Sequence, residues 1–167
     1  MLKRVRSRKT PSSSTPVRLA VVASEYNRKQ VDGLLDAAVR TLKEAGVEVD
    51  VYRVPGAFEI PVVAESLAGD ASRRWSAVVC LGVIIRGETG HADLVGTAVT
   101  QALMGIGVRH RIPVIHEVLL VADKAQADAR CFEPKFNRGG EAAQTALAMV
   151  RLMRRLPVAA EGGDVEG

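Results

Sequence analysis

The sequence predicts an α/β fold in which helices cover both faces of a parallel β-sheet. Four apolar, strand-like segments alternate with helical segments along the 167 residues. Parallel neighbours need crossover connections, and helices usually serve as those crossovers. The strands read as nearly continuous apolar runs, which is typical of a sheet covered on both faces. The length and the 47% hydrophobic content indicate one domain with a sizeable core.

The first half of this pattern contains two strands and two helices. Residues 17–24, VRLAVVAS, form an apolar strand. Apolar residues then recur at helical spacing from Val31 to Ala45, and Gly46 ends this helix. Residues 47–54, VEVDVYRV, alternate as a strand does. The next segment, PGAFEIPVVAESLAG, is a turn bounded by Pro and Gly that leads into a short helix.

The second half repeats the alternation. Residues 76–85, SAVVCLGVII, form the most apolar strand, and a helix is expected at about residues 91–108. Residues 113–121, PVIHEVLLV, form the fourth strand. Helical segments are expected around residues 123–131 and 137–155. The result is a three-layer α/β/α sandwich.

Positive charge is concentrated at the N-terminus. Residues 1–16 contain five Lys or Arg residues and no acid, so the remaining 18 basic residues nearly balance the 19 acidic ones. We expect a disordered basic tail at residues 1–16, a folded domain at 17–156 and a flexible tail at 157–167. An organelle transit peptide or contact with nucleic acid is the alternative for the basic tail.

Cysteine usage and hydropathy indicate the compartment. Cys80 and Cys131 lie far apart and match no zinc spacing, so a reducing, cytoplasmic environment is the default. No apolar run is long enough to cross a membrane.

Polar residues follow three of the predicted strands, in residues 24–27, 55–59 and 86–91. Ligands of parallel sheets bind beyond the carboxyl ends of the strands. In the third segment, Gly87 and Gly90 let the backbone approach a ligand, the next helix offers free N–H groups, and His91 can exchange a proton near neutral pH. The segment predicts a phosphate site beside a general acid/base. A capping or surface role for His91 is the simpler alternative.

Other common sites are disfavoured. The sequence has no Walker lysine, no complete dinucleotide fingerprint and no G-x-S-x-G motif. No lysine lies in an apolar strand, which disfavours an enzyme Schiff base.

The motifs VPGAFEIP (residues 54–61) and LGVIIRGETGH (residues 81–91) resemble the lumazine synthase family of riboflavin biosynthesis. The resemblance continues through IPVIHEVL, QADAR (126–130) and NRGGEAA (137–143), and covers about residues 17–155. It implies a flavodoxin-like core with strand order 2-1-3-4. It also implies homopentamers with each active site between two subunits, which assemble in some members into decamers or icosahedral capsids.

The resemblance also implies the reaction. 5-Amino-6-(D-ribitylamino)uracil condenses with 3,4-dihydroxy-2-butanone 4-phosphate to give 6,7-dimethyl-8-ribityllumazine, phosphate and water. This transferase step is the penultimate one of riboflavin biosynthesis and needs no metal or organic cofactor. The substrate supplies the amine for the imine, so no enzyme lysine is required.

Roles for individual residues follow from their positions in these motifs. His91 matches the catalytic acid/base histidine. The residues matching phosphate ligands are Glu88, Thr89, Arg130, which reaches over from a neighbouring subunit, and Arg138, which stands where the family often has lysine. The residues matching contacts to the pyrimidine and its ribityl chain are Tyr26, Asn27, Ala57, Phe58, Glu59, Val83, Ile84 and Ile85.

Some positions depart from the family pattern. Ala92 and Leu94 replace aromatic residues, and His116 and Glu117 replace a Phe-Gly pair whose phenylalanine lines the substrate pocket. His116 is therefore a candidate substrate contact, and the two residues place titratable groups where an apolar wall is expected. The alternatives are a repacked interface, a condensing enzyme with a different ketose phosphate, or a weakly active, shell-forming relative that binds a flavin or lumazine.

Overall fold

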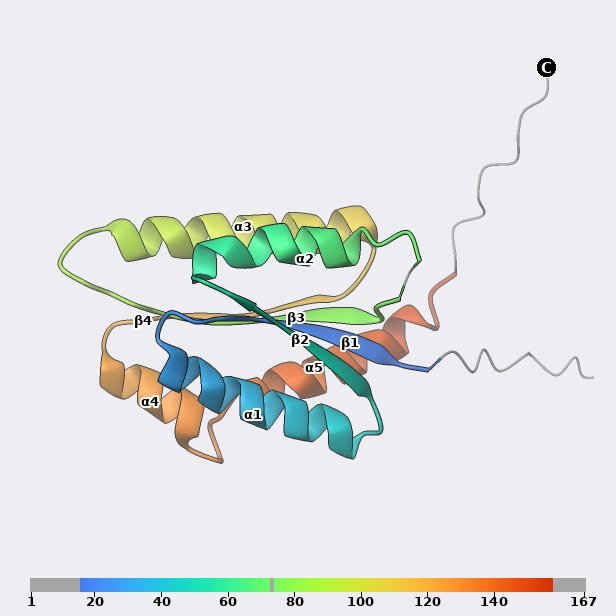
Figure 1. Cartoon of the computed structure of the whole chain (residues 1–167), viewed down its shortest axis with the longest axis horizontal. Helices are drawn as coiled ribbons and strands as arrows, with labels where there is room; N and C mark the ends of the chain where they lie inside the picture. The colour runs from blue at the N-terminus through green and yellow to red at the C-terminus, as the bar shows by residue number, and fades with distance from the viewer. Residues whose placement is uncertain (1–15, 73, 158–167) are drawn as a thin grey trace, which may run out of the picture.

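The computed structural model describes residues 16–72 and 74–157 (Figure 1). The predictions for residues 1–15 and 158–167 lie outside the described residues. The elements are, in chain order, β1 (Arg18–Ser24), α1 (Arg28–Glu44), β2 (Glu48–Val54), the 3₁₀ turn η1 (Ala57–Glu59), α2 (Ile60–Ala68), β3 (Ala77–Ile85), α3 (His91–His110), β4 (Val114–Val121), α4 (Lys124–Phe132) and α5 (Arg138–Met153).

The four strands form one parallel sheet in the order β2-β1-β3-β4. This order and the three-layer architecture confirm the predicted fold. The predicted strand bounds differ from the observed ones by one residue. The helices differ by up to three residues at their ends; α3 runs to His110 rather than residue 108, and α5 ends at Met153.

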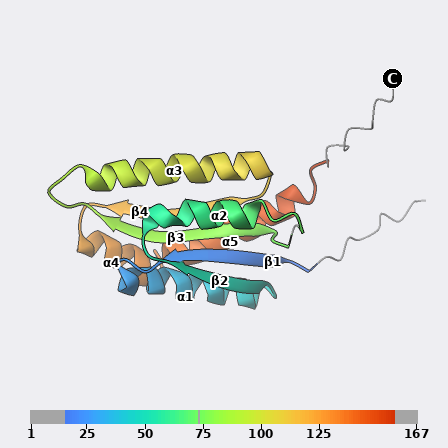
Figure 2. The same cartoon turned by 45° about the horizontal axis from the view of Figure 1, so that its top comes forward.

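Two hydrophobic cores lie on opposite faces of the sheet. Helices α1, α4 and α5 cover one face, and α2 and α3 cover the other (Figures 1 and 2). Alternate strand residues serve the two cores: Val21 of β1 packs toward α1, whereas Val22 packs toward α2 and α3. Burial on both faces explains why the central strands read as continuous apolar runs.

Helices α1 and α5 approach each other closely at Gly139. A Cβ atom at this position would lie 2.0 Å from the Leu34 carbonyl oxygen. Asn137 fixes the start of α5: its side chain accepts a hydrogen bond from the Gly139 N–H (2.8 Å) and donates to the carbonyl of Cys131 (2.6 Å). A capping side chain of this kind satisfies N–H groups that the helix leaves free.

Both cysteines are buried free thiols, and they belong to different cores. Burial raises the pKa of Cys80 to about 12. Burial, together with nearby acidic side chains, raises the pKa of Cys131 to about 12 as well.

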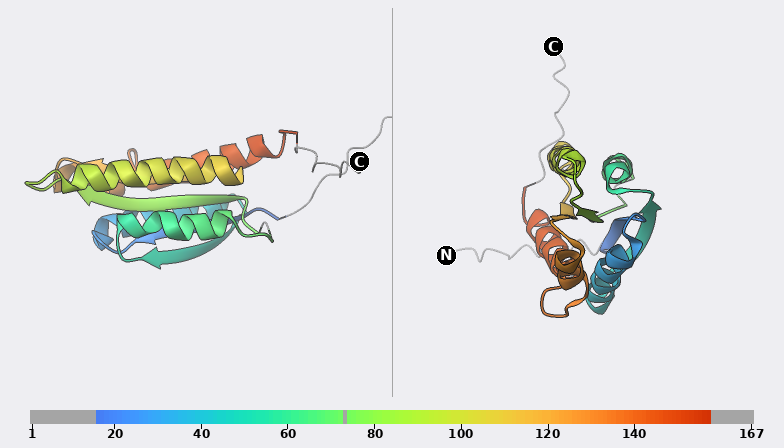
Figure 3. Two further views of the ribbon diagram at one scale, coloured as in Figure 1. Left: turned by 90° about the horizontal axis from the view of Figure 1, so that it is seen from above. Right: turned by 90° about the vertical axis from the view of Figure 1, so that its left-hand side faces the viewer.

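Because the strands are parallel, their carboxyl ends lie at the same end of the sheet, which we call its carboxyl edge. The connections that follow β1, β2 and β3 all lie at this edge, whereas β1 begins and α5 ends near the opposite edge (Figure 3). None of the described helices is long and apolar enough to cross a membrane.

Candidate active site

The turn after β1 is fixed by contacts to both neighbouring strands. The N–H groups of Glu25 and Tyr26 donate to the carbonyls of Val54 (2.8 Å) and Pro55 (3.0 Å). Asn27 adopts a left-handed conformation with φ of 55°, which asparagine tolerates better than most residues. Its side-chain amide donates to the Val83 carbonyl (2.8 Å). The ends of β1, β2 and β3 are thus tied together.

Two exposed aromatic residues stand at this edge. Tyr26 is 72% exposed, and Phe58 of η1 is 63% exposed. Gly56, just before η1, leaves room for the Glu59 side chain. A Cβ atom at Gly56 would lie only 2.9 Å from Oε2 of Glu59. Ala57 and Glu59 are partly exposed. These residues form an open surface with aromatic faces and one carboxylate.

The end of β3 presents only part of its predicted contacts. Val83 is 2% exposed, and its side chain packs in the core beneath α1 and α5. The Val83 side chain therefore contributes no surface in this chain, and its carbonyl is held by Asn27. Ile84 and Ile85 are partly exposed and point to opposite faces, because side chains alternate along a strand.

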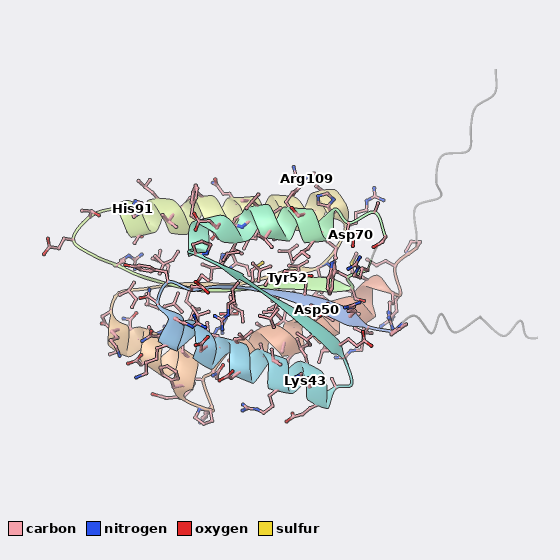
Figure 4. The ribbon with its side chains drawn as sticks, viewed as in Figure 1. Lys43, Asp50, Tyr52, Asp70, His91 and Arg109 are labelled. Carbon is pink, nitrogen blue, oxygen red and sulfur yellow. The ribbon has the colours of Figure 1, made fainter. Side chains whose placement is uncertain are left out.

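The turn from Ile85 to α3 carries the predicted acid/base residue. Glu88, Thr89 and Gly90 are exposed, and α3 begins at His91, at the tip of the molecule (Figure 4). The Thr89 hydroxyl accepts a long hydrogen bond from the His91 N–H (3.4 Å), while Gly90 provides no capping side chain. The 20-residue helix thus starts with N–H donors that remain accessible to an anion.

An ion pair braces this turn. The Arg86 guanidinium binds the Asp93 carboxylate (2.7 Å), which raises the pKa of Arg86 and lowers that of Asp93. The Arg86 N–H donates to the carbonyl of Val121 at the end of β4 (2.9 Å). This ion pair was not predicted from the sequence. Opposite charges on the two sides of a glycine-containing turn were the available signal.

His116 lies away from this edge. It pairs with Cys80 partway along β3 and β4 and precedes the end of β4 by five residues, which is roughly 16 Å of strand. Its Nε2 lies 2.9 Å from the Thr100 hydroxyl, which itself donates to the Gly96 carbonyl (2.8 Å). Because the hydroxyl has only one proton, Nε2 of His116 must be the donor.

Glu117 points to the opposite face of the sheet from His116. It is 6% exposed, and its Oε1 accepts from Nε of Arg138 (2.9 Å). Burial raises the pKa of Glu117, and Arg138 acts against that rise. Within a single chain, His116 and Glu117 therefore do not line the same pocket wall. Each has a partner on a different helix.

The two predicted phosphate arginines lie across the sheet from His91. Arg130 is on α4 and Arg138 begins α5, whereas α3 covers the other face. Arg130 is exposed and donates to the Gln126 carbonyl (3.2 Å). Arg138 binds the carboxylates of Glu117 and Glu141. One chain thus gathers Tyr26, Asn27, residues 57–59 and 84–85, and it does not bring Arg130, Arg138 or His116 to His91.

Two hollows lie elsewhere. One, of about 670 Å³, lies between α1 and β2, and the other, of about 270 Å³, lies at the amino end of the sheet beside Trp75 and His110. None of the predicted site residues lines either hollow. Among the described residues, no three His, Cys, Asp or Glu side chains are grouped as metal ligands.

Comparison with known proteins identifies the family. The family profile for 6,7-dimethyl-8-ribityllumazine synthase matches residues 16–154. Among curated relatives of that name, the protein of Nitrobacter hamburgensis is 41% identical over 143 residues, covering 83% of this chain and 87% of the relative. The protein of Xanthobacter autotrophicus is 42% identical over 145 residues, with 83% and 86% coverage. That of Thermococcus onnurineus is 41% identical over 139 residues, with 83% and 90% coverage. The chain, whose sheet order and carboxyl-edge turns follow the expected pattern, therefore belongs to the 6,7-dimethyl-8-ribityllumazine synthase family.

Proposed function

We propose that this protein condenses 5-amino-6-(D-ribitylamino)uracil with 3,4-dihydroxy-2-butanone 4-phosphate to form 6,7-dimethyl-8-ribityllumazine, phosphate and water. The observation that carries the proposal is the family match across residues 16–154, with His91 exposed at the start of α3 in the matching motif. The reaction is a step of riboflavin biosynthesis. None of the relatives described above has a name that indicates another ketose or a noncatalytic shell protein.

The geometry around His91 suits a reaction that releases phosphate. The N–H groups at the start of α3 and the Thr89 hydroxyl can hold the phosphate, and Glu88 contributes through its backbone. His91 begins this same helix, beside the proposed phosphate site, so it can move protons during imine formation and phosphate loss. The condensing amine belongs to the pyrimidine substrate, so the enzyme's task is orientation, anion binding and proton transfer.

The exposed surface formed by Tyr26, Asn27 and residues 57–59 suits the other substrate. The Tyr26 and Phe58 rings offer faces for stacking against a pyrimidine, and Glu59 can accept hydrogen bonds from ribityl hydroxyls. Partly exposed Ile84 and Ile85 at the end of β3 would contact the edge of the ring.

The active site is expected to be completed by a second subunit of a homopentamer. Arg130 and His116 do not reach His91 within one chain, so a neighbouring chain would supply them. Helices α2 and α3 also expose large apolar side chains that a subunit interface would bury: Val62, Leu94, Met104 and Val108, each at least 66% exposed. Mass photometry should give five times the subunit mass or a multiple of it, and a monomer would contradict this assembly. Decamers and icosahedral capsids are the larger multiples.

The location and the basic tail remain predictions. We expect a cytoplasmic protein, consistent with two buried free thiols. Contact of the N-terminal tail with nucleic acid falls on residues outside the described part, and salt-dependent binding of RNA to the full chain but not to a chain lacking residues 1–16 would support it.

The test is an optical assay of lumazine formation from the two purified substrates. His91→Ala should slow turnover by about 10²- to 10⁴-fold, the usual contribution of a general acid/base, and leave the affinity for inorganic phosphate largely intact. His110→Ala, which changes a histidine at the other end of α3 that pairs with Glu65, is the matched control and should keep nearly full activity. Unchanged turnover in His91→Ala would remove His91 from its role. Assembly without any product would favour the shell-forming alternative, and faster turnover of another ketose phosphate would favour the related condensing enzyme.

A further inference from the structure

Arg138 is held between two carboxylates. Its Nε donates to Oε1 of Glu117 on β4 (2.9 Å), and its Nη1 donates to Glu141 one turn further along α5. Glu117 is fixed on a strand and its side chain is 8% exposed, whereas the Glu141 side chain is half exposed. Of the five N–H donors of the guanidinium, those on Nη2 have no carboxylate partner among the described residues.

This arrangement changes the charge that Arg138 offers to an anion. One guanidinium beside two carboxylates carries a net negative charge locally. The buried Glu117 counts most, because exposed charges are screened by water and salt. Arg130 differs, since its guanidinium donates to a backbone carbonyl and forms no ion pair with a described residue. The two arginines therefore have different electrostatic roles.

The surroundings of Glu117 support a charged pair. Besides Arg138 and Glu141, His116 on its own strand acts on Glu117, and Glu117 in turn helps to raise the pKa of Cys131 on α4. Burial raises the pKa of Glu117, while its bond to Arg138 opposes that rise; Arg138 has a raised pKa because of Glu117. Among the described cations, Arg138 is thus the one that Glu117 binds directly.

We propose that Glu117 is a positioning residue for Arg138: it fixes the Nε edge of the guanidinium against β4 and cancels its charge, so that Arg138 presents directed N–H donors without net positive charge. This inference rests on the proposed function and on the motif match that places Arg138 among its phosphate ligands. It assigns the strong electrostatic attraction for phosphate to Arg130 and makes Arg138 a directional donor.

The experiment measures binding of inorganic phosphate to the assembled full-length protein by isothermal titration calorimetry, at low and high salt. Glu117→Gln keeps a hydrogen-bond acceptor of similar size and removes the charge. We expect the Kd for phosphate to fall roughly threefold or more at low salt, and the effect to shrink at high salt. The KM for the phosphorylated ketose should fall with it, while the KM for the pyrimidine should stay nearly constant. Glu117→Met, which also removes the charge, should give the same tightening if Glu117→Gln folds poorly.

Two further variants isolate the cause. The tightening should disappear in the double variant Glu117→Gln, Arg138→Gln, because the uncovered cation is gone. Glu141→Gln is the matched control for the half-exposed partner and should change the Kd less than Glu117→Gln. A purely structural role for Glu117 predicts altered melting with an unchanged phosphate Kd, and that result would overturn the inference.

The inference and the proposed function fail in different ways. If Arg130→Ala leaves the phosphate Kd unchanged, the proposed phosphate site is wrong. If Arg130→Ala weakens phosphate binding but Glu117→Gln and Glu117→Met do not strengthen it, only the role of Glu117 is refuted.

Discussion

Replacing Gly139 with alanine is expected to destabilise the protein strongly. The new Cβ would lie 2.0 Å from the Leu34 carbonyl oxygen and 2.6 Å from its carbon, where real Cβ contacts are not found below 3.0 Å. Both atoms belong to the backbone of α1, so no side-chain rotation relieves the overlap. Helices α1 and α5 would have to separate by about 1 Å, which loosens the core between them.

The cost follows from the size of that overlap. Overpacking a core typically costs 1–3 kcal/mol, and a clash between two backbones belongs near about 3 kcal/mol. In a domain of this size, each kcal/mol shifts the Tm by about 2–4 °C. Gly139→Ala should therefore lower the Tm by about 6–12 °C.

Gly140→Ala provides the matched control. Its nearest neighbour would be the Thr41 hydroxyl at 3.8 Å, an ordinary contact. Both glycines lie in the first turn of α5, so both variants gain similar helix propensity and their difference reports the overlap. Thermal melts followed by circular dichroism, at one fixed protein concentration, would measure that difference. If the two variants melt within about 2 °C of each other, the close-packing argument is refuted.

Three further outcomes are expected. Ser24→Ala should leave the free energy of unfolding unchanged or raise it by about 1 kcal/mol, because the hydroxyl is buried and finds no hydrogen-bond partner in the described part of the chain; a lower urea midpoint would contradict this. Cys80 and Cys131 should react with a thiol reagent only after unfolding, since their pKa values are about 12, and prompt reaction in the native state would count against their burial. Glu117 has a raised folded-state pKa, so its contribution to stability is greatest below the ordinary carboxyl pKa and is lost as pH rises through the folded value. In denaturation measured from pH 4 upward, the wild type should therefore lose stability relative to Glu117→Gln over that interval. A constant difference between the two proteins would contradict the shift.

The fold could be predicted largely from the sequence because local patterns and global architecture agree. Continuous apolar runs specify strands buried on both faces, and the helical spacing between them leaves few topologies. The turn around His91 could also be placed, because the end of a parallel strand and the start of its crossover helix are adjacent in sequence. Its open, exposed conformation agrees with that placement.

Long-range partners could not be predicted in the same way. Glu117 and Arg138 meet only because α5 packs against β4, and their separation in the sequence does not predict an ion pair. His116 and Glu117 are adjacent in sequence, yet strand geometry sends them to opposite faces. Val83 was matched to a pyrimidine contact, and the same alternation buries its side chain in this chain. Such details depend on which face each residue serves, and the sequence alone leaves that choice open for a strand that is apolar throughout.

The central position of β1 has a consequence for the order in which the protein can fold. This strand is made first, yet it lies between β2 and β3, and Leu19 pairs with Ala77 on its inner side. A nascent chain that stops before β3 can cover only one edge of β1 and leaves the backbone N–H and C=O groups of the other edge unpaired on an apolar strand, which promotes aggregation. Strand β4 can join only after β3 is in place. Truncation before residue 77 should therefore give an insoluble fragment on expression, and productive folding is expected to wait until β3 has left the ribosome.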